Sequence, residues 1–177
     1  MTLSRVAAWL TMTIAMMTMA SAAASAGQRL AIFPIDMSMP ASEEDYFRGV
    51  TGPTPAEQAR LDMARSEFEK LLAADGRYDI VDLGPLKDEI AAAQPISECN
   101  GCEIDIAAKA KADLVMTALI DKISETHLSL NVSIADVAQG KLVSSASVLI
   151  QGNTDEAWLH GVRWLVRNRL KAEASAQ

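Results

Sequence analysis

Residues 113–152 constrain the fold more than any other stretch of the chain. They open with a nearly continuous apolar run, residues 114–120, which predicts the central strand of the sheet. Two runs that alternate apolar and polar residues follow, and Gly140 lies in the short connection between them, where a hairpin needs a positive φ. We therefore expect a three-stranded antiparallel meander. The residues expected to face its core are Leu128, Leu130, Val132 and Ile134 in the second strand, and Leu142, Ala146, Val148 and Ile150 in the third.

Two short apolar runs before the meander, at residues 30–35 and 78–83, predict two further strands. A helix is expected between them. Thr54 and Glu57 have the spacing of a capping box at its start, and Gly76 is suited to end it.

Three more helices are expected, at residues 85–93, at residues 103–111 and after Thr154. The element order is then β-α-β-α-α-β-β-β-α. This order predicts an α/β (α+β) fold with a mixed five-stranded sheet, in which crossovers join parallel strands in the first half and helices pack on the sheet.

The amino terminus has the composition of a secretory signal peptide. Arg5 precedes an uncharged apolar stretch, residues 6–20, and Ala24 and Ala26 have the spacing of a cleavage site. Cleavage there would make Gly27 the first residue of an exported chain. An uncleaved membrane anchor is the alternative, although the apolar stretch is short for a membrane span.

The remaining chain is expected to form one α/β domain, residues 27–171, followed by a disordered tail, residues 172–177. Without Arg5 it has 15 basic and 23 acidic residues, a net charge of −8. This acidity argues against binding to nucleic acid or to an anionic membrane surface. No later apolar run is long enough to cross a bilayer, so the exported protein is expected to be soluble and periplasmic.

A long connection, residues 36–54, precedes the first helix and is the first candidate for a binding surface. The alternatives are a solvated variable loop and a small-ligand pocket beneath the loop. The candidate binding residues combine methionines, an acidic run and two aromatic rings: Asp36, Met37, Met39, Glu43, Glu44, Asp45, Tyr46 and Phe47.

Cys99 and Cys102 are the only cysteines in the sequence, and in an exported protein they are expected to form a disulfide. Thiol–disulfide exchange and metal binding remain open as alternatives. An exchange motif normally places its cysteine after a strand, whereas the residues before Cys99 have a helical pattern.

The sequence offers no further catalytic pattern. Met37 with Met39 could bind a soft metal, and Asp36 with residues 43–45 a hard cation, although these carboxylates lack the spacing of a calcium loop. His127 and His160 are the only histidines and do not have the spacing of metal ligands. Neither a nucleophile motif nor a glycine-rich phosphate loop is found. We therefore expect no enzymatic activity, no resident metal and no cofactor.

Four segments in order resemble the amino-terminal α/β domain of TolB and the related curli-secretion (CsgG-type) periplasmic domains. They are AIFPID (residues 31–36), RYDIVD (77–82), CNGCEIDIAAKAKADLVMTALIDKIS (99–124) and ADVAQGKLVSSAS (135–147). The resemblance implies membership of a secreted bacterial family built on this unit, with a non-enzymatic role in the cell envelope that depends on contacts with partner proteins.

The interpretation that combines these observations is an exported accessory or protein-interaction module of the cell envelope. Its contacts are expected at the loop of residues 36–53 or along an exposed sheet edge, by strand addition or loop capture. The alternative is a periplasmic thiol-redox or metal-handling protein that uses Cys99 and Cys102.

Overall fold

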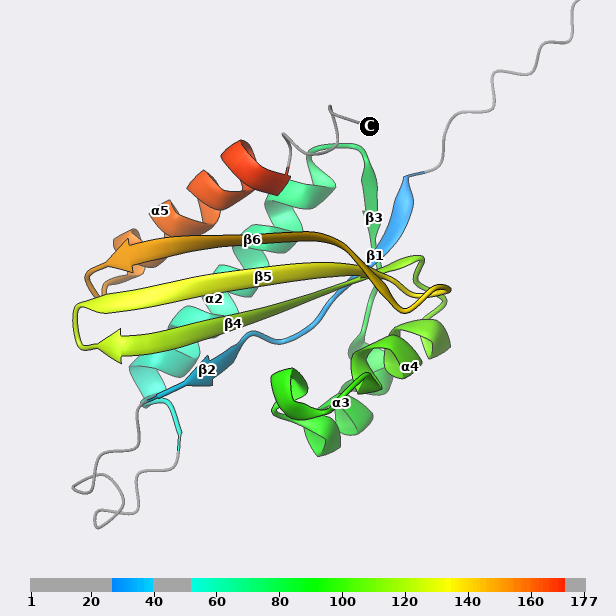
Figure 1. Cartoon of the computed structure of the whole chain (residues 1–177), viewed down its shortest axis with the longest axis horizontal. Helices are drawn as coiled ribbons and strands as arrows, with labels where there is room; N and C mark the ends of the chain where they lie inside the picture. Colours follow the sequence, from blue (N-terminus) through cyan, green and yellow to red (C-terminus); the bar gives the residue numbers. More distant parts are fainter. Residues whose placement is uncertain (1–26, 40–51, 171–177) are drawn as a thin grey trace, which may run out of the picture.

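A six-stranded mixed sheet with helices against both faces is formed by residues 27–39 and 52–170, the parts of the chain that the computed structural model describes (Figure 1). The predicted fold class and mixed sheet are confirmed, with six strands in place of five. Across the sheet the strands are β3 (Tyr78–Ile80), β1 (Gln28–Ile32), β4 (Leu114–Ser124), β5 (His127–Asp136) and β6 (Lys141–Gln151), with β2 (Asp36–Ser38) paired to β4.

Strand directions divide the sheet into two halves, as the sequence predicts. β1 is parallel to both β3 and β4, because the chain returns through a helix between each pair of strands. β4, β5 and β6 are antiparallel and form the predicted meander, and Gly140 has φ 61° in the β5–β6 turn. β4 therefore joins the two halves of the sheet.

The sixth strand, β2, corrects the expectation that a loop begins at Asp36. β1 ends at Ile32, the chain is irregular around Pro34, and β2 then pairs with β4 further along. Proline has no N–H to donate, which explains the interruption. The long connection therefore begins after Ser38.

Helix α2 (Pro55–Ala73) begins at the predicted capping box. The Thr54 hydroxyl accepts a hydrogen bond from the Glu57 N–H, while the Glu57 carboxylate accepts one from the Thr54 N–H. Gly76 has φ 76° just after the helix, as expected of a glycine that ends one.

The remaining helices and turns include those that the sequence predicts, with shifted ends, and one 3₁₀ turn at Ile96–Glu98 that it did not predict. They are η1 (Gly84–Leu86), α3 (Lys87–Ala93), η2 (Ile96–Glu98), α4 (Cys102–Lys109), α5 (Asp155–Leu165) and the π-helical turn η3 (Val166–Leu170).

Two hydrophobic clusters cover opposite faces of the sheet. Phe68 of α2 and Trp158 of α5 are fully buried in the larger cluster, on the face that these two helices cover (Figure 1). Phe33 belongs to the smaller cluster, which lies between the sheet and the α3–α4 region. Within the described residues, no helix covers this second face over the half of the meander beyond α3 and α4.

Several expectations concern residues outside the described parts. The signal peptide with its cleavage after Ala26, the loop residues 40–51 and the tail residues 172–177 remain predictions. Within residues 27–39 and 52–170, none of the helices is long and apolar enough to cross a membrane.

Candidate functional site

The predicted binding loop is only partly described. Asp36 and Met37 lie in β2, and Met37 packs against the larger hydrophobic cluster. Met39 follows the strand and is partly exposed. The loop candidates Glu43, Glu44, Asp45, Tyr46 and Phe47 lie outside the described residues, so their role stays a prediction.

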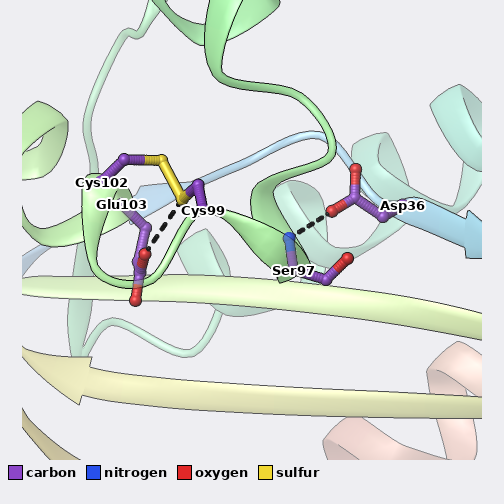
Figure 2. Close-up of a disulfide and its surroundings, with 5 residues drawn as sticks. All are labelled: Asp36, Ser97, Cys99, Cys102 and Glu103. Atoms are coloured by element: carbon purple, nitrogen blue, oxygen red, sulfur yellow. Dashed lines mark hydrogen bonds between the residues drawn. A yellow bond between two sulfur atoms is a disulfide. The ribbon is translucent and has the colours of Figure 1, made fainter.

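Asp36 has a structural contact rather than an exposed carboxylate. It is buried, and its Oδ2 accepts a hydrogen bond of 2.7 Å from the backbone N–H of Ser97 in η2 (Figure 2). A buried carboxylate requires such a donor, since an unpaired one would be strongly destabilising. Asp36 therefore ties β2 to the turn that holds the cysteines.

Cys99 and Cys102 are joined by a disulfide, which agrees with the first expectation for this pair (Figure 2). Asn100 and Gly101 between them have positive φ angles of 52° and 105°. Cys102 begins α4, and both cysteines pack against the smaller hydrophobic cluster. The disulfide thus closes the turn between η2 and α4 and holds it against the sheet.

Glu103 lies beside the disulfide, with its Oε2 3.5 Å from Cys99 Sγ. A disulfide sulfur has no proton to donate, so this approach is a contact rather than a hydrogen bond. Cys99, Cys102 and Glu103 form the one group of potential metal ligands in the described part of the chain. Metal ligation would require both cysteines as thiolates, whereas here they are joined in a disulfide.

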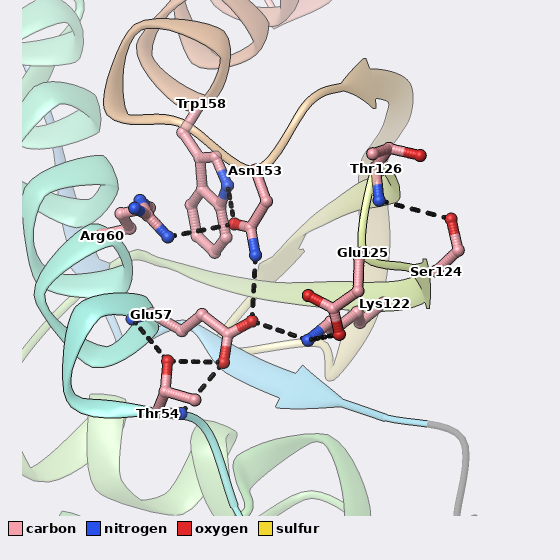
Figure 3. A network of polar contacts seen from close by, with 9 residues as sticks. All are labelled: Thr54, Glu57, Arg60, Lys122, Ser124, Glu125, Thr126, Asn153 and Trp158. Atoms are coloured by element: carbon pink, nitrogen blue, oxygen red, sulfur yellow. Dashed lines mark hydrogen bonds and ion pairs between the residues drawn. The ribbon is translucent and has the colours of Figure 1, made fainter.

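Sequence reasoning missed a buried polar network around Glu57, which is 2% exposed (Figure 3). Its Oε1 contacts Lys122 Nζ of β4 at 2.9 Å and accepts a hydrogen bond of 3.0 Å from Asn153 Nδ2. Its Oε2 accepts hydrogen bonds of 2.9 Å from both the N–H and the hydroxyl of Thr54. All four partners are donors, so the site fits a carboxylate.

These partners determine the ionisation of the pair. Burial by itself would raise the pKa of Glu57, but the hydrogen bonds from Thr54, Lys122 and Asn153 outweigh it and lower the pKa from 4.5 to about 2. Burial would likewise lower the pKa of Lys122, yet Glu125 and Glu57 raise it above its usual range. Both groups are therefore charged at neutral pH.

The Glu57 network fixes the connection between β6 and α5. Asn153 lies in that connection, and its Oδ1 accepts hydrogen bonds of 3.2 Å from Arg60 Nη1 and 3.1 Å from Trp158 Nε1 (Figure 3). Helix α5 also packs closely on β6, because a Cβ added at Gly161 would lie 2.7 Å from Ile150 Cγ1. The network and this contact together set the position of α5 along the sheet edge.

The outer edge of β6 is the main candidate surface. β6 is the last strand of the sheet and has 11 residues, and no described strand pairs with its outer side from Ser145 to Gln151. Residues 142–151 carry no charge and no proline, the features with which proteins usually protect an edge strand. Val143 and Leu149 are large apolar residues on β6 and are 48% and 54% exposed.

Leu142 corrects one detail of the predicted third strand. It was expected to face the core with Ala146, yet it is 60% exposed. The β5–β6 register shifts between Ile134 and Ala135, so that Leu142 pairs with Ala135. Residues paired across strands share a face, which places Leu142 on the opposite face from Ala146.

A groove of about 570 Å³ runs between β6 and α5, and we refer to it as the β6 groove. Figure 1 shows α5 lying along the outer side of β6 in this view. The residues that line the groove are Val148, Leu149, Ile150, Gln151, Thr154, Glu156, Ala157, His160, Gly161 and Trp164.

Sequence comparison assigns the chain to a family. A profile of DUF3280, described as "Protein of unknown function (DUF2380)", matches residues 28–170. The chain belongs to this family. No curated protein matches the sequence.

Solved structures with a similar arrangement are only distantly related in sequence. The hypothetical protein CT253 from Chlamydia trachomatis is 15% identical with a TM-score of 0.51, and the match covers 85% of this chain and 99% of that one. The LpoB C-terminal domain from Salmonella enterica is 16% identical with a TM-score of 0.49, covering 71% and 84%. The likeness to CT253 shows a shared fold and nothing more specific.

TolB is among the similar structures, as the sequence resemblance implies. TolB from Acinetobacter baumannii is 13% identical with a TM-score of 0.44, and the match covers 82% of this chain and 29% of TolB. The curli-secretion part of the resemblance stays a prediction.

Sequence reasoning anticipated the disulfide and the capping box but missed the Glu57 network and the β6 groove. The capping box was the one available signal for the network, because it places a glutamate at a helix start. Lys122 and Asn153 are far from Glu57 in the sequence, and no local pattern links them to it. The uncharged run of residues 142–151 was visible, but its position at the edge depends on the strand order.

Proposed function

We propose that this protein is a non-enzymatic accessory module of the cell envelope, and that it binds another polypeptide along the outer edge of β6. The observation that carries the proposal is the uncharged, proline-free edge from Ser145 to Gln151, beside a groove lined by both apolar and polar side chains. An exposed edge of this kind offers unpaired backbone groups and side-chain pockets to an extended segment.

Export to the periplasm is part of the same proposal. It is supported by the predicted signal peptide and by the disulfide, since disulfides persist mainly in oxidising compartments. The rival function, thiol exchange at Cys99 and Cys102, would require a reactive thiolate. The nearby carboxylate of Glu103 disfavours one.

Site-specific photo-crosslinking in the exporting cell tests the binding surface. A photoreactive amino acid replaces Ser147 on β6 of the full chain, and a control places it at Lys70, which is exposed on α2. We expect a discrete polypeptide adduct from position 147, none from position 70, and loss of the adduct when S145K is added. The purified adduct partner must also bind the unmodified chain and not S145K. Equal adducts from both positions, or an adduct indifferent to S145K, would exclude the β6 edge.

Alkylation of the purified exported protein distinguishes a structural disulfide from the rival function, thiol exchange. A structural disulfide leaves no thiol to label before reduction and is not opened by a mild thiol reductant. Rapid labelling after mild reduction would instead support thiol exchange.

A further inference from the structure

We propose that the β6 groove takes a single extended polypeptide segment, with apolar side chains at alternate positions and a basic rather than an acidic residue at the end beside Glu156. This inference rests on the proposed function and specifies the chemistry of its ligand. It follows from the geometry of the edge, the position of α5 and the charges around the groove.

The edge fits an added strand. Successive side chains of a strand point to opposite faces, so every second side chain of an added segment would enter the β6 groove. There it would contact Ala157, Gly161 and Trp164 on α5. Apolar side chains suit this environment, whereas the other set would lie beside Leu149 and Ser147 on the exposed face.

A lone segment fits this space better than a second folded sheet. α5 already lies along the outer side of β6 on one face (Figure 1). If two copies paired β6 to β6 about a two-fold axis, their helical layers would lie on the same face of the joined sheet. Each α5 would then compete with the partner's helices for the same volume. An extended segment carries no helical layer and avoids this conflict.

Charge favours a basic residue in the segment beside Glu156, whereas near Trp164 the guanidinium of Arg169 lies over the ring, 5.9 Å from its centroid. Glu156 lines the groove, and the lining includes neither lysine nor arginine. Arg163 of α5 is paired with Glu67 of α2, with 2.6 Å between Nε and Oε1. The whole chain has a net charge of −7, which adds a long-range attraction for cations at low salt.

Synthetic peptides of defined sequence test the inference. The first fluorescent peptide has about nine residues, a length that spans the β6 edge. Valine and threonine alternate along it, and it has lysine at each end. A second peptide has glutamate at each end, and a third is the lysine peptide methylated at all of its amides. Binding to the chain of residues 27–177 is followed by fluorescence anisotropy, alone and with the variants E156Q and D155N.

We expect the lysine peptide to bind at least about fivefold more tightly than the glutamate peptide at low salt. E156Q should abolish this preference. D155N should keep it, because Asp155 pairs with Arg60 rather than lining the groove. The methylated peptide should not bind, because it cannot donate hydrogen bonds to β6.

Three results would overturn the inference. The first is equal binding of the lysine and glutamate peptides, and the second is binding of the methylated peptide. The third is a dimer in sedimentation equilibrium that S147K dissociates, since the edge would then be occupied by a second copy. If no peptide binds while the adduct from position 147 persists, the ligand chemistry is wrong and the proposed function stands. Loss of both removes the proposed function as well.

Discussion

At the scale of one residue, Glu57 belongs to a local capping motif and also contacts residues that are distant in the sequence. The capping box is a property of four consecutive residues, but the same carboxylate also receives Lys122 from β4 and Asn153 from the β6–α5 connection. One side chain therefore couples the start of α2 to the structure that shapes the β6 groove.

Replacing this carboxylate by an amide should be costly. In E57Q an amide NH₂ group would face the hydrogen-bond donors that now surround the carboxylate. We expect this substitution to lower the free energy of unfolding by about 2–4 kcal/mol. Urea unfolding followed by tryptophan fluorescence measures the loss. E69Q is the matched control, because Glu69 is in a partly exposed pair with Arg65 and should cost less than about 0.5 kcal/mol. Equal effects of the two variants would contradict a special role for Glu57.

The Glu57 network should also make stability depend on pH. The pKa of Glu57 is lowered from 4.5 to about 2 in the folded protein, so its stabilisation is complete above pH 4.5 and is lost as the pH falls toward 2. The difference in unfolding free energy between the natural chain and E57Q should therefore shrink by about 3 kcal/mol across this range. Urea titrations at several pH values measure it, and a constant difference would refute the assignment.

At the scale of elements, the cysteine turn and the α5–β6 contact are the two places where neighbouring elements are locked together. The disulfide holds η2 next to α4, and Asp36 joins the same turn to β2. Gly161 allows α5 to approach Ile150 closely.

Removing the disulfide should weaken the fold without abolishing it. The cross-linked ring contains few residues, so C99S/C102S should lower the free energy of unfolding by only about 1–2 kcal/mol. Chemical unfolding of this variant, beside the oxidised natural chain, checks the value. A double variant that no longer folds would show that the turn does more than close a short ring.

Adding one methyl group at Gly161 should destabilise the protein. In most helices, replacing glycine by alanine gains up to about 1 kcal/mol, but here the new Cβ would meet Ile150 Cγ1 at 2.7 Å and Cδ1 at 2.9 Å. We expect G161A to cost about 1–2 kcal/mol net. In a double-mutant cycle, I150V should cost less in the G161A background than alone, because it removes Cδ1. Strict additivity would disprove the clash.

At the scale of the whole molecule, the sheet has a protected centre and a long edge strand, β6, at one end. β4 and β5 lie inside it and have side chains buried by α2 and α5, whereas no described strand pairs with the outer edge of β6 from Ser145 to Gln151.

Hydrogen exchange should reproduce this gradient. The amides of β4 and β5 should exchange slowest, and the outward amides of β6 should exchange fastest within the meander. Mass spectrometry of the exchanged protein after proteolysis would resolve the strands. Binding of the lysine peptide should slow exchange in β6 selectively, with α3 as an internal control. Uniform exchange across the three strands would contradict the open edge.

The sequence predicted the secondary-structure elements more completely than it predicted which of them lie next to one another. The hairpin glycine, the capping box and the cysteine pair are local patterns, and each occurs as expected. β2 was missed because three residues after a proline carry little pattern, and its pairing is with β4, over 80 residues away. The groove was missed because it depends on which strand ends the sheet and on where the Glu57 network places α5.

The break at Pro34 determines on which face of the sheet each side chain of β2 lies. Leu30 pairs with Leu114, but Asp36 pairs with Leu119, so the chain carries one residue more than β4 across the break. Successive side chains of a strand point to opposite faces of the sheet, so this extra residue reverses which face the odd-numbered and the even-numbered residues take. Ile35 and Met37 therefore join the layer under α2, while Asp36 turns toward Ser97 and the cysteine turn. The number of residues at the break, rather than their chemistry, decides that a carboxylate meets a backbone amide and not an apolar core.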